Sequence, residues 1–166
     1  MAGLRVHHVG GRAASVEVTI TIRVLGPDEA GVLDHVAPDV FDNPIDPRWC
    51  AEFFADPRHH LIVALDGDLV VGMASGVHYV HPDKAPDLWI NEVAVASTHH
   101  NQGIGRQLVA TLAEHGKTLG CREAWVLTSP TNEPAKRMYR AAGAVADELS
   151  VMYTYRLHDR AGDNGA

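Results

Sequence analysis

Positive charge is scarce in this chain of 166 residues. Lys and Arg together number 14 against 21 Asp and Glu, so the formal net charge is −7 with histidine neutral. Proteins that bind nucleic acid without sequence preference are normally basic, and the composition therefore disfavours nucleic acid as a partner. An acidic protein attracts cationic ligands instead, so the charge favours a small cationic molecule as the partner.

Cysteine is also scarce, with only Cys50 and Cys121. They lie far apart in the sequence and show no metal-ligand spacing, and we interpret both as reduced and structural. The sequence has no His-Glu-x-x-His or Cys-x-x-Cys motif. Several of its 11 histidines form adjacent pairs, which point to opposite faces when they lie on a strand. We therefore expect no bound metal.

Long apolar runs are missing as well. None approaches the roughly 20 residues that are needed to span a bilayer. The first residues show no basic segment followed by an apolar one, as a secretory signal would. We therefore expect no membrane segment and a cytoplasmic protein. Apolar residues still make up 46% of the chain, which predicts a globular fold with a core of its own.

Hydrophobic periodicity and turn residues predict alternating strands and helices. Strands are predicted over 16–25, 60–65, 69–79, 89–95, 123–128, 145–147 and 150–157, and helices over 27–36, 47–55, 130–142 and from 102–105 to 119. The Asp-Gly pair at 66–67 predicts a hairpin turn, and Gly120 predicts the end of a helix. Antiparallel hairpins thus precede a parallel strand–helix–strand crossover, which should be right-handed. Residues 1–15 and 159–166 lack periodicity and are expected to be tails on either side of one domain, residues 16–158.

Packing expectations are specific for two of these segments. Residues 38–47 contain three prolines and are predicted to form a loop, which is either a connector or a substrate-facing lip. In the helix that follows, Trp49, Phe53 and Phe54 are predicted to pack inward. The strand over 123–128 is predicted to be buried.

A glycine turn stands between a strand and an amphipathic helix at Gln102-Gly103-Ile104-Gly105. The first N–H groups of a helix are free, and with the positive end of the helix dipole they form an anion site. Gly103 and Gly105 have no Cβ to keep a phosphate from the backbone. The turn lacks the lysine of a nucleoside-triphosphate loop and the third glycine of a dinucleotide fingerprint, so both sites are excluded. Alone, it fits a plain helix start equally well.

The residues around this turn resemble the acetyl-CoA motif of the GNAT N-acetyltransferase superfamily. The resemblance rests on the Glu-Val-Ala-Val segment Glu92–Val95, a short polar spacer, and Gln102–Gly105 at the start of a helix. Members usually carry Arg or Gln where this chain has His100, which weakens one side-chain contact to the pyrophosphate but leaves the backbone contacts intact. The resemblance implies that acetyl-CoA contacts Val93, Ala94, Val95, His100, Gln102, Gly103, Ile104, Gly105, Arg106, Asn132 and Ala135.

This resemblance extends over about residues 18 to 157 and implies a fold. The GNAT fold is an α/β (α+β) architecture with a mixed, mostly antiparallel central sheet flanked by helices. Its parallel βαβ crossover lies at the acetyl-CoA site. Acetyl-CoA is thus the implied co-substrate, and an acetyltransferase is the implied enzyme.

A second stretch that resembles the family is Asn132-x-x-Ala135-x-x-x-Tyr139-x-x-x-Gly143. These spacings place the four residues along one stripe of the predicted helix. In GNAT enzymes the Asn contacts the pantetheine region and the Tyr points at the thioester sulfur. Taken without the resemblance, the pattern fits a buried tyrosine whose hydroxyl bonds to the backbone.

Acetyl transfer to an amine needs a base, a donor to the thioester carbonyl and a proton for the leaving sulfur. The resemblance implies that a backbone N–H within Val93–Val95 polarises the carbonyl and that Tyr139 donates to the sulfur. Glu92 is the candidate base, although it could equally bind the ammonium group or be a surface glutamate. Strand alternation places Asn91 and Val93 on the face opposite Glu92. The predicted catalytic residues are Glu92 and Tyr139.

The substrate expectation also comes from the resemblance, which is greatest to aminoglycoside 3-N-acetyltransferases. These enzymes modify one amino group of a polycationic sugar. Carboxylates that would line such a site, if their loops converge, are Asp39, Asp42, Asp46, Asp147 and Glu148. Alternatives are an acetyltransferase for a polyamine, an amino acid or a protein N-terminus, and a non-catalytic acetyl-CoA-binding domain. Partner chains often complete acceptor sites in this family, so a homodimer is compatible with the resemblance.

Overall fold

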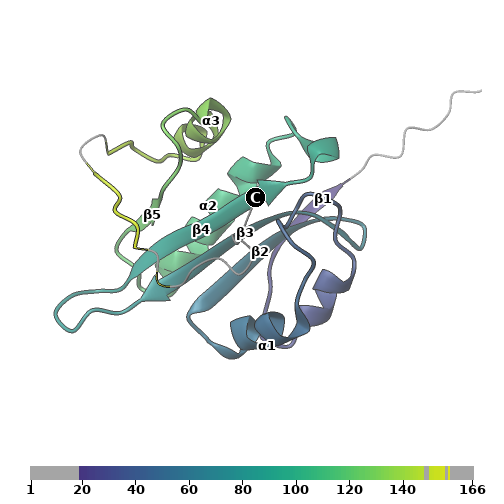
Figure 1. The fold of residues 1–166 in the computed structure, drawn as a ribbon, viewed down its shortest axis with the longest axis horizontal. Helices are drawn as coiled ribbons and strands as arrows, with labels where there is room; N and C mark the ends of the chain where they lie inside the picture. Colours follow the sequence, from purple (N-terminus) through teal and green to yellow (C-terminus); the bar gives the residue numbers. More distant parts are fainter. Residues whose placement is uncertain (1–18, 148–149, 156, 158–166) are drawn as a thin grey trace, which may run out of the picture.

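The computed structural model describes residues 19–147, 150–155 and 157, and its centre is one sheet of five strands in sequence order. The strands are β1 (Ile20–Val24), β2 (His59–Asp66), β3 (Leu69–Tyr79), β4 (Asp87–Val95) and β5 (Ala124–Val126). The first four pair antiparallel, whereas β4 and β5 are parallel and are joined through α2 (Ile104–Thr118) (Figure 1). The predicted mixed, mostly antiparallel sheet with one parallel crossover is confirmed.

The remaining helices are η1 (Ala30–Asp34), α1 (Pro47–Ala55), η2 (Ser97–His99) and α3 (Glu133–Ala141). Helix α2 covers one face of the sheet, and η1 and α1 lie on the other (Figure 1). No helix among the described residues is long and apolar enough to cross a membrane.

The helix predicted over 27–36 is wrong in type and length, because only a short 3-10 helix forms there. The Glu29 side chain accepts a hydrogen bond from the backbone N–H of Gly26 at 2.8 Å, which holds a turn before that helix. After it, Ala37 donates its backbone N–H to the Val70 carbonyl at 2.8 Å. The chain is thereby drawn to the sheet before a full α-helix can form.

Glycines with positive φ mark two of the predicted turns. Gly67, between β2 and β3, has φ of 63°, as the tight Asp-Gly hairpin requires. Gly120 has φ of 79° and follows the end of α2. Both the hairpin and this helix end are confirmed.

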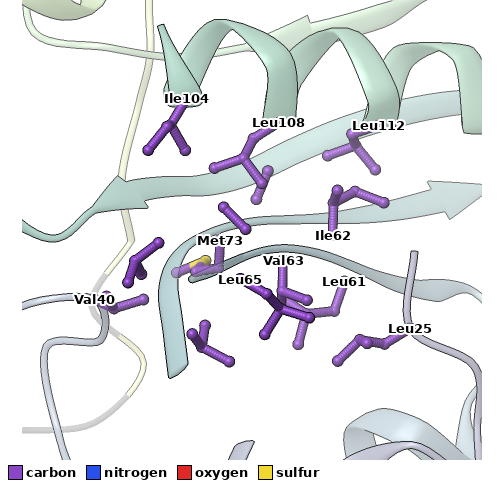
Figure 2. Close-up of a cluster of buried hydrophobic side chains, with 14 of the residues drawn as sticks. Leu25, Val40, Leu61, Ile62, Val63, Leu65, Met73, Ile104, Leu108 and Leu112 are labelled. Carbon is purple, nitrogen blue, oxygen red and sulfur yellow. The ribbon is translucent and has the colours of Figure 1, made fainter. Parts of the chain in front are cut away.

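The core lies in two layers, one on each face of β2. Figure 2 shows Leu108 and Leu112 pointing from α2 toward the sheet, where Ile62 points back at them, while Leu61 and Val63 point to the other face. All five side chains are buried. Because successive strand side chains alternate, β2 contributes to both layers.

Burial of the strand over 123–128 was expected and is wrong. Only three of these residues form β5, and Trp125 is 40% exposed. Its ring stacks on Trp89 with centroids 5.7 Å apart, and its Nε1–H donates to the Tyr79 hydroxyl at 2.8 Å. The strand lies at the edge of the sheet, where aromatic stacking and one hydrogen bond replace full burial.

The two closing strands predicted over 145–147 and 150–157 are also wrong for the described residues, which form no strand there. Their apolar side chains are exposed, as Val145 at 94% and Tyr155 at 84% show. Alternating apolar residues fit a half-buried sheet surface, but a strand also needs a neighbouring strand to bond, and no described strand pairs with this segment. The predicted tails, residues 1–15 and 159–166, lie outside the described residues.

Three histidines from three elements form a hydrogen-bonded chain in the layer below α2. His60 on β2 is 7% exposed, with Nε2 2.8 Å from Nδ1 of His78 on β3 and Nδ1 3.1 Å from Nε2 of His115 on α2. Three neutral rings satisfy both bonds, because His60 then donates one hydrogen bond and accepts the other. Burial, followed by the charges of His115, His78 and His59, lowers the pKa of His60 from 6.5 to about 4.

The three hydrogen-bonded histidines predict that the protein loses stability in acid. In the unfolded protein His60 takes up a proton near pH 6.5, whereas in the folded protein it does so only near pH 4. The contribution of neutral His60 to the stability of the fold is therefore complete above pH 6.5 and is lost as the pH falls toward 4. We expect urea unfolding to show a decrease of about 1–2 kcal/mol between pH 7 and 4.5. His60→Gln, which does not titrate in this range, should depend less on pH. His35→Gln, at an exposed ring, is the control. If His60→Gln keeps the pH dependence of the wild type, or if His35→Gln reduces it as much, His60 is not the group responsible.

Candidate active site

A cavity of about 650 Å³ opens on the face of the sheet opposite α2. Its floor is a row of paired residues across three strands, because Leu61 of β2 pairs with Ser75 of β3, which pairs with Glu92 of β4. Residues 41–46 form one rim, and α1 forms the adjacent wall. The proline-containing loop therefore borders a cavity, which favours the lip over the simple connector.

A β-bulge on β4 brings two polar side chains to this floor. Ser75 pairs with Glu92 but the next residue, Gly76, pairs with Ile90, so that Asn91 is an extra residue in β4. A bulge lets consecutive side chains point to one face. Asn91 and Glu92 both line the cavity, and the expectation that Asn91 faces away from Glu92 is wrong.

Aromatic side chains from the 41–46 loop and α1 line the cavity. Phe41, Phe53 and Phe54 line the cavity and also pack against the core, as predicted for the two α1 phenylalanines. Trp49 lines it too but is 57% exposed, so the expected inward packing of Trp49 is wrong. The guanidinium of Arg48 lies 4.6 Å from the centre of its ring, and the tryptophan forms an exposed aromatic rim.

Three carboxylates also line the cavity. Asp42, Asp46 and Glu92 all line it, whereas Asp147 does not and accepts a hydrogen bond from Ser150 Oγ at 2.5 Å. Glu148 lies outside the described residues. The structure thus brings together three of the carboxylates named from the sequence.

The carboxylates of Asp46 and Asp39 also have partners within the fold. Asp46 caps α1, because its Oδ1 accepts the backbone N–H groups of Arg48 at 2.8 Å and Trp49 at 3.3 Å. Asp39 Oδ2 accepts the N–H of Ser97 at 3.2 Å and does not line this cavity. These bonds give both side chains a structural role.

Glu92 has the properties expected of a base. Burial, and then the negative charge of Asp42, raise the pKa of the Glu92 carboxyl above its ordinary range. A higher pKa makes a carboxylate a stronger proton acceptor at neutral pH. Among the described residues, no lysine or arginine lines the cavity to oppose this effect.

Both cysteines are free, as expected. Cys50 lines the cavity, and burial followed by the charge of Asp34 raises the pKa of its thiol. The thiol therefore stays protonated near neutral pH and is a poor nucleophile.

The glycine turn before α2 provides an open helix start. Gly103 is the residue before the first turn, has φ of 77° and offers no side-chain cap to the helix N–H groups. A Cβ placed on Gly103 would meet nothing within 4 Å, so the space above it is clear. The first N–H groups of α2 are thus available to an anion.

Gly105 also has a packing role that the sequence did not indicate. A Cβ on Gly105 would lie 2.8 Å from the Met138 sulfur of α3, so this glycine lets the two helices pack. Ile104 is buried at 2% exposure, and only its backbone can face a ligand, whereas the side chains of Gln102 and Arg106 are exposed.

His100 connects the turn to the end of β4. Its Nε2 lies 2.8 Å from the carbonyl oxygen of Val95, so a protonated Nε2 donates to that oxygen. The hydrogen bond fixes the position of the turn relative to the strand. The side-chain contact to a pyrophosphate that was expected of His100 is untested by this geometry.

The edge of β4 that faces β5 is only partly paired. The two strands pair over Leu88–Ile90 of β4 and then separate. Residues Val93, Ala94 and Val95 consequently have no strand partner on this side among the described residues. Unpaired backbone groups at such an edge can bond an extended ligand that carries amides.

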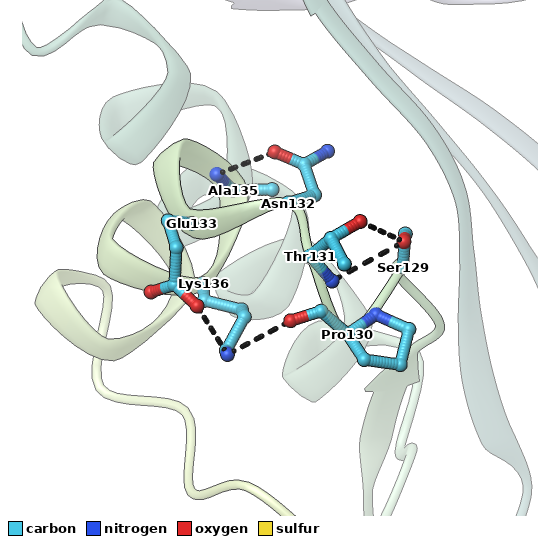
Figure 3. Close-up of polar contacts among 7 residues, drawn as sticks. All are labelled: Ser129, Pro130, Thr131, Asn132, Glu133, Ala135 and Lys136. Atoms are coloured by element: carbon cyan, nitrogen blue, oxygen red, sulfur yellow. Dashed lines mark hydrogen bonds and ion pairs between the residues drawn. The ribbon is translucent and has the colours of Figure 1, made fainter.

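Helix α3 carries the second motif. Asn132 caps it, with Oδ1 accepting the N–H of Ala135 at 3.1 Å, and Figure 3 shows this cap beside the ion pair of Lys136 with Glu133 at 2.6 Å. Tyr139 is partly buried against the core, and burial raises the pKa of its hydroxyl. In the described part of the chain that hydroxyl makes no hydrogen bond, unlike the buried tyrosine considered as the alternative. It is therefore available as a donor.

Reasoning from the sequence missed the aromatic wall and Asn91. Phe41 lies in a loop, where no periodicity indicates which way a side chain points, and Trp49 of α1 was expected to pack inward. Asn91 needed the bulge, which depends on how β3 and β4 pair. Only the adjacent phenylalanines of α1 gave a signal, through the apolar face of their helix.

Comparisons with known proteins agree with this geometry. The family described as Acetyltransferase (GNAT) matches residues 32–144. The aminoglycoside N(6')-acetyltransferase type 1 of Salmonella typhimurium is 28% identical over 106 residues, covering 61% of this chain and 72% of that enzyme. The L-2,4-diaminobutyric acid acetyltransferase of Oceanobacillus iheyensis is 31% identical over 91 residues, and the chain spans only 48% of its length.

A solved structure supports the fold. An aminoglycoside acetyltransferase from an uncultured soil metagenomic sample, in complex with sisomicin, aligns with a TM-score of 0.70 at 20% identity, covering 84% of this chain and 97% of that one. The position named for the Salmonella relative is 6', and not the 3-position expected from the sequence. The family match spans more than half of the chain, and it agrees with the open helix start and the separated strands, so this chain belongs to the acetyltransferase (GNAT) family.

Proposed function

We propose that the protein transfers the acetyl group of acetyl-CoA to a primary amine of a small polycationic molecule, with an aminoglycoside as the first candidate. The observation that carries the proposal is the position of Glu92. It lies on the floor of the acidic cavity, and the next residues, Val93–Val95, form the open edge of β4. Acceptor and donor sites would therefore meet at the bulge.

The donor would be bound mainly by backbone groups. Acetyl-CoA supplies the acetyl group as a thioester. The N–H groups at the start of α2 would hold its pyrophosphate, and the open edge of Val93–Val95 would bond the pantetheine amides. An N–H within that segment would polarise the thioester carbonyl. The clear space above Gly103 fits this arrangement.

Two side chains would carry out the proton transfers. Glu92 would accept a proton from the ammonium form of the acceptor, directly or through water, so that the nitrogen becomes a nucleophile. Tyr139 would donate its hydroxyl proton to the departing sulfur. Its raised pKa keeps that proton in place near neutral pH. An unbonded tyrosine hydroxyl supports an enzyme over a domain that only binds acetyl-CoA.

The proposal is tested by release of the coenzyme A thiol across a panel of amines. The panel contains kanamycin-type and gentamicin-type aminoglycosides, a linear polyamine, 2,4-diaminobutyrate and a peptide with a free N-terminus. We expect turnover with aminoglycosides, and mass spectrometry with NMR of the product then distinguishes acetylation of the 3-amino group from the 6'-amino group. Turnover of the peptide alone would reject the substrate, and no turnover with any amine would reject the enzyme.

Gly103→Val should weaken acetyl-CoA binding by at least about tenfold, which corresponds to about 1.4 kcal/mol. The branched side chain would occupy the clear space at the helix start, where the pyrophosphate is proposed to bind. The control is Gly120→Val, because Gly120 has a similar φ of 79° at the other end of α2 and equally clear surroundings. Both variants should lose stability, by about 1–2 kcal/mol each. Calorimetry that finds equal affinities in both variants would reject the site.

A further inference from the structure

The charge of the cavity is one-sided. Three carboxylates line it, from Asp42, Asp46 and Glu92, and no lysine or arginine among the described residues does. Aromatic side chains, including Phe41 and Trp49, line the same cavity. An acceptor that carries its own carboxylate would therefore be repelled and would leave that group unpaired, which costs free energy in a partly enclosed site.

The three carboxylates are not equivalent. Asp46 uses its side chain to cap α1, and Glu92 lies beside the open edge of β4. Asp42 accepts no hydrogen bond and forms no ion pair with any described residue, although it lies in the rim of the same cavity. A ligand can therefore pair with Asp42, as with Glu92, without breaking a bond of the fold.

Asp42 is also close enough to Glu92 to act on it. The negative charge of Asp42 contributes to the raised pKa of the Glu92 carboxyl. Two carboxylates that sense each other within one cavity can bind two ammonium groups of a single molecule. The aromatic wall, with Phe41 and Trp49, would cover the apolar skeleton between those groups.

We infer that Asp42 is a specificity-determining residue that binds a second ammonium group of the acceptor while Glu92 faces the amine to be acetylated. The inference rests on the proposed function and narrows it. The acceptor carries at least two amines and no carboxylate, so the enzyme selects against amino acids such as 2,4-diaminobutyrate, the substrate named for one relative. An ammonium group bound to Asp42 would also partly offset the negative charge that, after burial, raises the pKa of Glu92.

The test compares a diamine and a monoamine of one skeleton, 1,3-bis(aminomethyl)cyclohexane and aminomethylcyclohexane, with the amino acid 2,4-diaminobutyrate. We expect kcat/KM for the diamine to exceed that for the monoamine by about two- to fivefold, because Asp42 is exposed and an exposed ion pair contributes about 0.2–1 kcal/mol. Asp42→Asn should remove most of this preference by raising KM for the diamine, with little effect on the monoamine. Diaminobutyrate should be the poorest of the three.

Asp46→Asn is the matched control, because asparagine caps a helix as well as aspartate does while the same charge is lost from the cavity. It should reduce the diamine preference less than Asp42→Asn does. A diamine preference that survives Asp42→Asn, or efficient turnover of diaminobutyrate, overturns the inference and leaves acetyl transfer standing. Wild-type protein that acetylates none of the amines overturns both.

A pH profile separates this role from a structural one. Removing the charge of Asp42 lowers the pKa of Glu92, so the acidic limb of kcat/KM for the monoamine should move to lower pH in Asp42→Asn. An Asp42 that only supports the loop would change activity without moving this limb. An unmoved limb therefore counts against the inference.

Discussion

Glu92→Gln is expected to lower kcat by about 10²- to 10⁴-fold, the range observed when a general base is removed. Glutamine keeps the size and the hydrogen bonding of the side chain but cannot take up the proton of the acceptor. Burial and Asp42 raise the pKa of Glu92, so wild-type activity should fall as the pH drops through that pKa and the carboxylate becomes protonated. The variant should lack this acidic limb. Steady-state kinetics from pH 5 to 9 measure both effects.

The same measurement distinguishes the two roles considered for Glu92. A residue that only binds the ammonium would raise KM and leave kcat almost unchanged. Glu52→Gln is the control, because it makes the same substitution on α1 at an exposed residue that does not line the cavity. Wild-type kcat, KM and pH profile in Glu92→Gln would remove Glu92 from the site.

Tyr139→Phe is expected to lower kcat by about 10- to 1000-fold while the affinity for acetyl-CoA changes little. The hydroxyl is needed only as the sulfur departs, so its loss raises the barrier for chemistry without removing a binding contact. Phenylalanine retains the packing of the ring against the core. Pre-steady-state kinetics should show that the chemical step is the one that slows.

The matched control is Tyr79→Phe, which removes a tyrosine hydroxyl that accepts a hydrogen bond from Trp125 outside the cavity. It should cost some stability and leave kcat near the wild-type value. If Tyr139→Phe behaves like this control when chemistry is rate-limiting, Tyr139 is a packing residue and another group protonates the sulfur.

Features that depend on a few neighbouring residues could be predicted. The hairpin turn at Gly67, the helix end at Gly120 and the open turn at Gly103 each need a positive φ, which glycine adopts without steric cost. The strands β2, β3 and β4 and the helix α2 follow from periodicity. Local chemistry was enough for these elements and for the open helix start before α2.

Features that depend on contacts between distant segments could not be predicted from the sequence. Gly105 was interpreted as a point of close approach for a phosphate, whereas the sulfur of Met138 on α3 fills the space beside it. The segment over 150–157 has the alternation of a strand, but the structure shows no partner strand for its described residues. Periodicity indicates which face of a helix or strand is apolar but does not identify the segment that packs against that face.

The site divides in the same way. By itself the sequence determined the residue types: a glutamate within a strand, a glycine turn before a helix and a tyrosine on a later helix. Tertiary structure alone decided which side chains share a cavity. It placed Asn91 beside Glu92 through a bulge and brought Asp42 but not Asp147 to the same rim. The reason is that register and loop convergence are set by hydrogen bonds and burial between segments far apart in the chain, and no short stretch of sequence contains both partners.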